Sequence, residues 1–197
     1  KRRRVLFLAE AVTLAHMVRP VSLAQALDPA RYEVGLAADA RYDHLFPELP
    51  FERLPLYSIS SRSFLEVLAK GQPIYHTGTL RRYVEEDLAL IRRWSPDLVV
   101  GDFRLSLAVS AREAGIPYVT VTNAYWSPYA RQRYPLPEHV TARMFGVSAA
   151  QALFRVLRPA IFALHTLPLN RVRRERGQAS LGLDLRRVYT DADHVLY

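Results

Sequence analysis

Short apolar runs alternate with longer segments of helical periodicity along this chain of 197 residues. Five apolar runs bounded by turn residues predict buried strands at 5–9, 32–37, 51–54, 98–100 and 118–122. Apolar residues recur every three or four positions elsewhere, which predicts helices at 18–27, 78–94 and 105–114. Gly115 follows the last of these helices and suits a left-handed C-terminal cap. The alternation predicts an α/β fold, a Rossmann-like doubly wound parallel sheet with helices on both faces.

The segments between these elements are less regular. Residues 40–46 predict a short helix. Residues 56–77 predict a long loop with a helical piece at 64–70, and such loops are often binding loops. A second loop is predicted at 123–137, which is rich in Tyr, Trp and Pro.

The C-terminal third of the chain changes in character. Residues 141–167 predict a long apolar helical region with a kink at Pro159, and 169–177 predict a separate basic helix. The final stretch, 192–197, has the pattern of a further strand. Because a domain rarely stops inside a strand, we expect the chain to be a fragment.

Composition excludes several classes of site. Half of the residues are hydrophobic and 23% are charged, which is typical of a globular domain with a sizeable core. The chain has no cysteine, so disulfides and cysteine-based zinc sites are excluded. The histidines lack metal-ligand spacing, so we expect no metal. We find no apolar run of about eighteen residues, the length that predicts a transmembrane helix.

The net charge of +8 is carried almost entirely by arginine. Such a charge attracts nucleic acid, anionic lipid or a phosphate-bearing ligand. No nucleic-acid-binding motif accompanies it and the arginines are widely spread, so we favour a generally basic surface and expect no nucleic-acid partner. The segment 169–177 stays open to two interpretations. A solvated basic helix is favoured, and contact with anionic lipid is the alternative.

His16 and Asp102 are the first candidates for chemistry. We place His16 in the loop between the strand at 5–9 and the helix at 18–27, and Asp102 follows the strand at 98–100. In a sheet of strand order 3-2-1-4-5 these two loops are neighbours at the carboxyl edge, where the order reverses and ligands bind. A carboxylate on one imidazole nitrogen fixes the tautomer and leaves the other nitrogen to accept a proton. The pair therefore predicts a general base with its orienting acid.

Each of these two residues also has a simpler interpretation. A lone loop histidine such as His16 more often only packs or caps, and its position alone favours that role. Asp102 is equally well placed to cap the N-terminus of the helix at 105–114. The local sequence leaves both alternatives open.

Five stretches occur in a characteristic order: 15–27 (AHMVRPVSLAQAL), 31–34 (RYEV), 96–102 (PDLVVGD), 114–119 (AGIPYV) and 169–177 (LNRVRRERG). Together they resemble the N-terminal, acceptor-binding domain of a GT-B glycosyltransferase of the UDP-glycosyltransferase-like superfamily. Each motif alone has low specificity, whereas their order and spacing run along most of the chain. The resemblance implies that 1–197 is one half of a GT-B fold.

The resemblance also implies a reaction. His16 is carried over as the general base that deprotonates an acceptor hydroxyl, and Asp102 as the carboxylate that orients it. The acceptor oxygen then attacks the anomeric carbon of a nucleotide sugar with inversion, as in a hexosyltransferase. The nucleotide sugar is a co-substrate, and no other cofactor is implied. In this superfamily a C-terminal domain holds the donor, and its motifs are not found in the chain, so we expect no transfer by the chain alone.

Two features depart from the family pattern near His16. Ala15 stands where the family usually has Gly, and the spacing from His16 to Pro20 is one residue longer than in the commonest form. Related branches have a His-x-x-Arg variant, which places Arg19 near the cleft as an acceptor-binding residue. These departures concern the role of His16 more than the fold.

Further acceptor contacts are expected just after the strand at 118–122. Asn123, Tyr125 and Trp126 should rim the crevice, where aromatic side chains suit an apolar or sugar-like acceptor. For Trp126, anchoring of a packed loop is an equally good interpretation.

Three residues of the long loop, Phe64, Leu65 and Tyr75, have two interpretations. They would form a lid over the crevice if the loop closes on a ligand. Surface packing is the simpler role and is favoured.

We therefore expect the acceptor-binding half of an inverting glycosyltransferase, cytoplasmic and in peripheral contact with the membrane. Its expected partners are a small acceptor, apolar or a glycolipid, and a C-terminal donor-binding domain. The alternative is a non-catalytic acceptor-binding or recruiting subunit of a two-chain glycosyltransferase. A different nucleotide-binding module is disfavoured because the chain has no Gly-x-Gly-x-x-Gly fingerprint.

Overall fold

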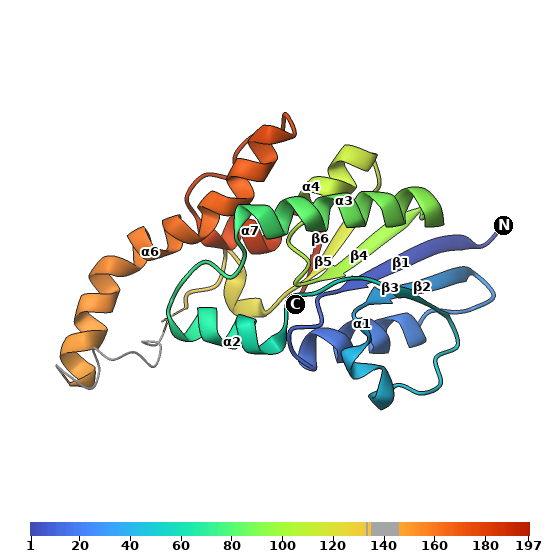
Figure 1. Cartoon of the computed structure of the whole chain (residues 1–197), viewed down its shortest axis with the longest axis horizontal. Coiled ribbons are helices and arrows are strands. Elements are labelled where there is room, and N and C mark those ends of the chain that lie inside the picture. The colour runs from blue at the N-terminus through green and yellow to red at the C-terminus, as the bar shows by residue number, and fades with distance from the viewer. Residues whose placement is uncertain (133, 135–145) are drawn as a thin grey trace.

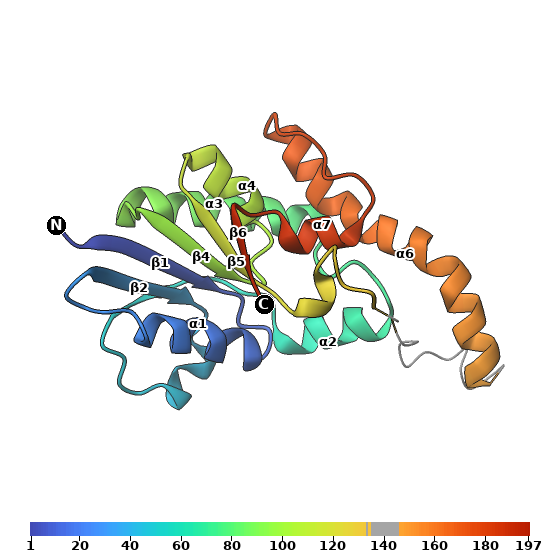
Figure 2. The same ribbon diagram turned by 180° about the vertical axis from the view of Figure 1, so that it is seen from behind.

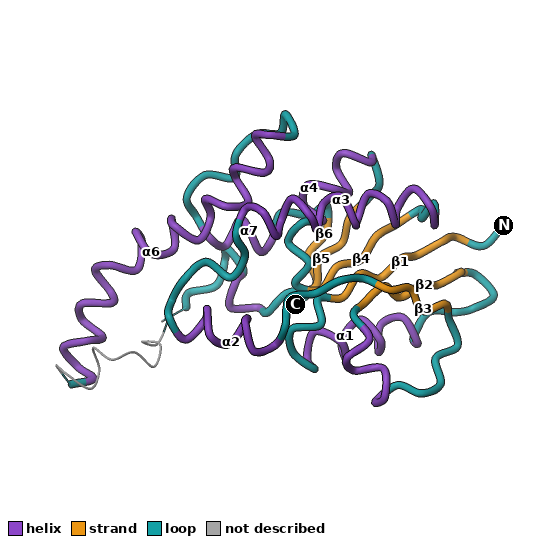
Figure 3. Tube along the Cα trace, in the orientation of Figure 1, coloured by secondary structure: helices purple, strands orange, loops and turns teal. Residues whose placement is uncertain are grey.

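The computed structural model describes residues 1–132, 134 and 146–197. Its centre is a six-stranded parallel sheet in the order β3-β2-β1-β4-β5-β6, with the strands side by side (Figure 3). In chain order the strands are β1 (Arg3–Ala9), β2 (Tyr32–Ala38), β3 (Glu52–Pro55), β4 (Leu98–Asp102), β5 (Tyr118–Val121) and β6 (His194–Leu196). The order reverses between β1 and β4, which confirms the predicted arrangement. The C-terminal stretch adds the expected further strand beside β5.

Helices cover both faces of this sheet (Figures 1 and 2). They are α1 (Ala15–Gln25), α2 (Ser61–Ala69), α3 (Thr77–Trp94), α4 (Leu107–Ala114), α6 (Val147–Glu175) and α7 (Leu185–Thr190), with two 3₁₀ helices, η1 (Ala40–Leu45) and η2 (Ala124–Trp126). α1 packs on one face of the sheet, whereas α3 and α4 pack on the other. The predicted Rossmann-like α/β fold is confirmed.

The side chains of β1 explain why both faces are covered. Successive residues of a strand point to opposite faces. Val5 and Phe7 join the core beneath α1, whereas Leu6 and Leu8 join the core beneath α3 and α4. All four are buried, so leaving either face open would expose a continuous apolar surface.

α1 begins earlier than the sequence predicted. Its first turn is already helical at Met17, whose backbone N–H donates to Leu14 O at 3.0 Å. Met17 is fully buried against the sheet, so core packing holds this turn in place. The prediction of a loop position for His16 is therefore wrong. His16 lies in the first turn of a helix that the sequence placed at 18–27.

α6 is a single helix of 29 residues where the sequence predicted two. Pro159 and Pro168 both lie inside it, and each removes one backbone hydrogen bond. Leu169 and Val172, just beyond the second proline, are buried in the core, and this packing carries the helix through the interruption. Residues 141–145 of the predicted helical region lie outside the described residues.

The basic end of α6 corrects a second expectation. Arg173 is only 1% exposed and donates to Asp191 at 2.6 Å and to the carbonyl of Ala108 at 3.1 Å. The interpretation of 169–177 as a solvated basic helix therefore holds only for its outer residues, such as Arg171 and Arg174.

Local capping signals agree better with the structure. Gly115 ends α4 at φ +67°, the left-handed conformation predicted for it. The helical piece predicted at 64–70 is α2, which begins earlier because the Ser60 side chain accepts a hydrogen bond from Ser63 N at 3.0 Å. A cap outside the apolar pattern thus sets the start of this helix.

Candidate active site

Neighbouring strands bring His16 and Asp102 to one point at the carboxyl edge of the sheet. Ala9 and Asp102, the last residues of β1 and β4, are paired in register. The backbone N–H of Glu10 then donates to Asp102 O at 3.1 Å. Gly101 permits this packing, because a Cβ there would come within 2.5 Å of a leucine side chain of α4. The backbone therefore fixes where the Asp102 side chain starts.

The side chains of His16 and Asp102 form a hydrogen-bonded pair, called the dyad below. Nδ1 of His16 lies 2.7 Å from Oδ1 of Asp102. Asp102 is completely buried and His16 is 9% exposed. We assign the proton to Nδ1 because an ionised carboxylate only accepts hydrogen bonds. Within the described residues no group hydrogen-bonds Nε2, so that nitrogen is left as a proton acceptor.

The structure decides one alternative for Asp102. α4 begins later than predicted, and the residue at its N-cap position is Ser106, which makes no side-chain cap hydrogen bond. The carboxylate of Asp102 contacts His16 and Arg19 instead of the helix N-terminus. A helix-capping role for Asp102 is therefore excluded.

Phe103 supports the imidazole from one side. Its ring stacks on His16 with centroids 4.6 Å apart and on Tyr189 with centroids 5.7 Å apart. The backbone of Phe103 has φ +58°, a left-handed conformation that is uncommon outside glycine. Such strain is often stored at functional sites. Sequence reasoning did not assign a role to Phe103, and its position directly after Asp102 was the available signal.

Arg19 lies one turn along α1 from His16 and faces the same carboxylate. One guanidinium nitrogen donates to Asp102 Oδ1 at 2.7 Å, and another donates to Asn123 Oδ1 at 2.9 Å. The first nitrogen also lies 2.9 Å from His16 Nδ1, because two donors converge on one oxygen. The side chain of Arg19 is 30% exposed, so it reaches the surface while it holds the dyad.

The residues predicted to rim the crevice fall into two groups. Asn123 accepts from Arg19 and donates through Nδ2 to the Tyr125 hydroxyl at 2.9 Å. A chain of hydrogen bonds therefore runs from the dyad carboxylate to Tyr125, which is 43% exposed. Trp126 instead stacks on Tyr189 with centroids 4.3 Å apart, the packing that suits a loop anchor.

The candidate lid residues also separate. Phe64 and Tyr75 are buried and pack around Phe103, with ring centroids 5.9 and 6.2 Å away. Leu65 is exposed on α2. The favoured interpretation, surface packing, is therefore wrong for the two aromatic residues, which are buried and form a wall behind the stacked imidazole.

A buried charge network lies behind the dyad, and sequence reasoning missed it. Arg104 donates to Glu10 Oε2 and to Asp87 Oδ1, both at 3.0 Å, and the Tyr83 hydroxyl donates to Glu10 at 2.7 Å. Burial raises the pKa of both carboxyl groups, and the charge of Arg104 opposes that rise. Glu10 opens the segment that leads to His16, so the network fixes that segment. The sequence signal for this network was a charged residue just after each of two strands, Glu10 after β1 and Arg104 after β4.

Neither cavity size nor metal ligands mark this site. A cleft of about 730 Å³ lies between β3 and α3, where Arg53, Tyr57 and Arg93 line it, and the dyad does not. Among the described residues, no three His, Asp or Glu side chains are grouped to hold a metal ion. Hydrogen-bond geometry is what singles out the dyad.

Known proteins give this geometry a context. Over all 197 residues the chain is 55% identical to a PGL/p-HBAD biosynthesis rhamnosyltransferase of Mycobacterium bovis, of which it covers 44%. It is 52% identical to a PGL/p-HBAD biosynthesis glycosyltransferase of Mycobacterium tuberculosis, of which it covers 46%. The chain is a relative of these glycosyltransferases. It spans about half the length of the curated relatives that it matches.

Two further comparisons concern activity and fold. An inactive PGL/p-HBAD biosynthesis glycosyltransferase of Mycobacterium bovis is 52% identical over the whole chain, which covers 54% of it. The solved structure of spinosyn rhamnosyltransferase SpnG superposes with a TM-score of 0.50 at 15% identity, over 93% of this chain and 43% of that one. The chain matches no protein-family model. These findings fit the N-terminal part of a GT-B glycosyltransferase, as the sequence resemblance implied.

Proposed function

We propose that the chain is the acceptor-binding half of an inverting glycosyltransferase whose general base is His16. The contact between His16 Nδ1 and Asp102 Oδ1 at 2.7 Å carries this proposal. It orients the imidazole so that Nε2 is left without a partner among the described residues. The dyad also lies at the strand-order reversal between β1 and β4, where open α/β sheets bind ligands.

The proposed reaction needs one proton acceptor. The acceptor hydroxyl gives its proton to His16 Nε2 while its oxygen forms a bond to the anomeric carbon of the donor sugar. The bond from that carbon to the nucleotide diphosphate breaks, and the electron pair leaves with the diphosphate. Attack from the opposite side inverts the anomeric configuration. Asp102 stabilises the imidazolium that forms, and a positioned base of this kind contributes about 10²–10⁴-fold.

The acceptor is proposed to bind along the hydrogen-bond chain that leaves the dyad. Tyr125 ends that chain, and its hydroxyl accepts from Asn123, so the hydroxyl proton is available to an acceptor oxygen. The hydrogen bond from Arg19 to Asn123 orients the Asn123 amide toward Tyr125, and Arg19 also contributes positive charge to the proposed acceptor site. Trp126 takes part through its packing, which anchors the same loop.

The names of the relatives support a proposal for the substrates. Because the chain is 55% identical to a PGL/p-HBAD biosynthesis rhamnosyltransferase, we propose a rhamnosyl donor and an acceptor of the PGL/p-HBAD class. The donor is a nucleotide sugar held mainly by the other half of the enzyme, which is proposed to work in the cytoplasm. No metal ion takes part in the proposed step.

A non-catalytic acceptor-binding subunit is the second candidate. The observation that favours it is the relative named inactive, which is 52% identical over the whole chain. Relatives of similar identity to the chain are thus named both as glycosyltransferases and as an inactive glycosyltransferase, so a measurement of transfer has to distinguish the two candidates.

The proposal is tested in the full-length protein with His16→Ala and Asp102→Asn. Removal of the base should reduce transfer by about 10²–10⁴-fold with donor binding unchanged by calorimetry. Asp102→Asn keeps the shape but removes a charge about 4 Å from the imidazolium. This interaction is about 4 kcal/mol at an effective dielectric of 20, or about a 10³-fold slower reaction.

His44→Ala is the matched control, because His44 is an exposed histidine outside the site. It should transfer at the unsubstituted rate. Undiminished transfer by the His16→Ala protein would refute the assignment of the base. Absence of transfer in the unsubstituted protein, together with normal acceptor binding, would favour the non-catalytic alternative.

A further inference from the structure

The N-terminal two thirds of α6 present an apolar surface to solvent. Five exposed large side chains share one face of the helix by helical periodicity, whereas the exposed Val147 at its start lies off this face. The five are Leu153, Val156, Leu157, Leu164 and Leu167, called the apolar stripe below. The exposed fraction reaches 76% at Val156. Nothing in the described structure covers this face.

The opposite face of α6 is the one that contacts the protein. Phe162 packs against Trp126 and Tyr134, with ring centroids 6.1 and 5.1 Å away. The polar residue Gln151 is only partly exposed, whereas Leu153 and Val156 are open. A surface helix of a globular protein normally has the reverse arrangement, with the polar face outward. The apolar stripe is therefore built to be covered by something else.

α6 reaches well beyond the sheet, as Figures 1 and 2 show from opposite sides. By length and composition alone it is the one helix among the described residues that could cross a membrane. Its last turns are committed to the fold, because Leu169 and Val172 are buried and Glu175 pairs with Arg81 at 2.7 Å. Crossing a membrane would pull these residues out of the core. An orientation flat on a surface leaves the core intact.

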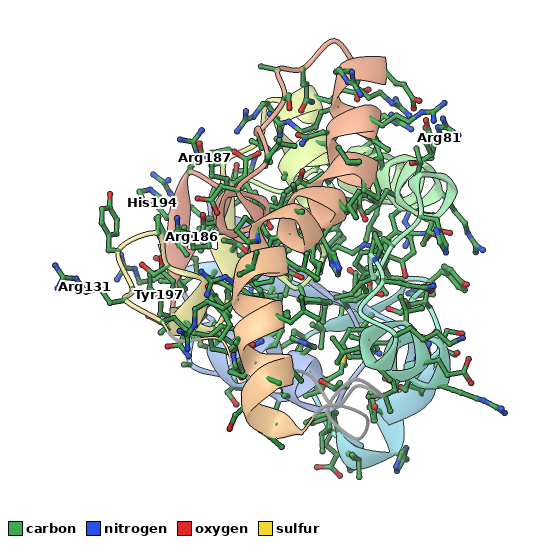
Figure 4. All side chains as sticks on the ribbon, turned by 90° about the vertical axis from the view of Figure 1, so that its left-hand side faces the viewer. Arg81, Arg131, Arg186, Arg187, His194 and Tyr197 are labelled. Carbon is green, nitrogen blue, oxygen red and sulfur yellow. The ribbon has the colours of Figure 1, made fainter. Side chains whose placement is uncertain are left out.

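The charges around the apolar stripe are positive. From 147 to 174 the helix contains five arginines and no acidic residue. The exposed residues Arg171 and Arg174 continue the face of the stripe beyond it, whereas the exposed Arg155 falls on another side of the helix by helical periodicity. Figure 4 shows Arg131 and Arg187 at separate points on the same side of α6. An apolar face bordered by arginines complements a bilayer that contains anionic lipid.

We propose that the apolar stripe of α6 docks the protein on an anionic membrane surface, with the helix lying in the interfacial plane. Leucine and valine side chains enter the boundary between headgroups and acyl chains, and arginines meet the lipid phosphates. A second copy of the chain is a poorer occupant, because pairing two such faces would bring their arginines together in a chain of net charge +8. The surface includes exposed arginines of the basic segment 169–177 first considered for lipid contact and adds the apolar stripe on the N-terminal side of it.

The test measures co-sedimentation with vesicles of phosphatidylcholine that contain about one third phosphatidylglycerol, and with vesicles of phosphatidylcholine alone. The unsubstituted chain should bind the anionic vesicles, and raised salt should weaken binding because it screens the arginines. The triple variant Leu153→Glu, Leu157→Glu and Leu164→Glu should bind at least about tenfold more weakly.

A matched control separates the apolar stripe from net charge. Leu23, Leu45 and Leu183 are exposed leucines elsewhere on the surface. Their triple substitution to Glu removes the same side-chain type and lowers the net charge equally. This control should retain binding within about threefold, because its three substitutions lie outside the apolar stripe and change only the long-range charge term, which salt screens.

Three outcomes would overturn the proposal. They are failure of the unsubstituted chain to bind anionic vesicles at low salt, equal binding to neutral vesicles, and equal loss in both triple variants. Light scattering that shows a dimer dissolved by the stripe substitutions, without vesicle binding, would assign the stripe to a second copy instead. None of these measurements depends on glycosyl transfer, so their outcome does not test the proposed catalytic role of His16.

Discussion

Replacement of Arg104 by Met tests the network that holds the segment before His16. The side chain of Arg104 has no solvent exposure and lies between the buried carboxyl groups of Glu10 and Asp87. Its guanidinium also lies 3.6 Å from the centre of the Tyr83 ring. Met has a similar length without charge or donors. The substitution therefore leaves two buried carboxyl groups without their shared cation.

The expected loss of stability is about 3–5 kcal/mol at neutral pH, the usual effect of removing one partner from a buried ion pair. Each contact contributes about 4 kcal/mol at an effective dielectric of 20, so the loss of both would be larger if both groups stayed ionised. Protonation of the two carboxyl groups in the variant limits the loss of stability. Against a total stability of about 5–15 kcal/mol, the loss is a large fraction.

The pH dependence has a definite sign. Burial holds the pKa of Glu10 and of Asp87 above the ordinary value, and the charge of Arg104 opposes this. A carboxyl group with a raised pKa in the folded state contributes stability below its unfolded pKa and loses it as pH rises through the folded pKa. Without Arg104 both pKa values rise further. The variant should therefore differ least from the unsubstituted chain near pH 4 and most at pH 7.

Urea unfolding followed by far-ultraviolet circular dichroism at pH 4.5 and pH 7 measures both effects. Arg62→Met is the control, because the Arg62 side chain is 89% exposed and its ion pair is with Glu66, one helical turn away. It should change stability by less than about 0.5 kcal/mol. Adding Glu10→Gln to Arg104→Met should restore part of the loss. A loss below about 1 kcal/mol at pH 7, or one that is equal at both pH values, would refute this account of the network.

Two further predictions concern the aromatic residues around the dyad. Phe103→Gly should be at least as stable to urea as Phe103→Ala, because at φ +58° Gly avoids a strain of about 1 kcal/mol; a clearly more stable Ala variant would contradict this. Trp126→Ala should lower the free energy of unfolding by about 2–4 kcal/mol through its lost contact with Tyr189, whereas Tyr125→Ala should stay within about 0.5 kcal/mol. Equal effects of the last two substitutions would remove the distinction between loop anchor and exposed rim.

The sheet was predictable because its signals are local and repeated. The runs at 5–9 and 98–100 are short and apolar, and each joins a helix whose apolar face has the right period. Parallel strands joined by right-handed crossovers then leave few arrangements. Element boundaries were less predictable. Capping by Ser60 and burial of Met17 extend α2 and α1 by a turn that the apolar pattern does not contain.

Only those contacts of the site that follow from strand order could be predicted from the sequence. Register between β1 and β4 places Asp102 near the start of α1, so the meeting with His16 could be inferred from strand order. The position of Arg19 on the same carboxylate oxygen depends on helix phase, because the two residues share a face only once α1 begins at Ala15. Contacts such as Phe103 on His16 depend on a backbone conformation that the sequence pattern does not encode.

The dyad and the crevice rim differ in how firmly they are held. His16 has a hydrogen bond to the buried Asp102 on one edge and the ring of Phe103 on one face, and Phe103 in turn packs against buried aromatic residues. Preorganisation of this kind lets a base act without rearrangement when the proton is transferred. The rim ends in Tyr125, which is 43% exposed. A fixed imidazole beside an open rim suits the proposed enzyme half, which would orient its base in advance and let the acceptor and a donor held elsewhere complete the site.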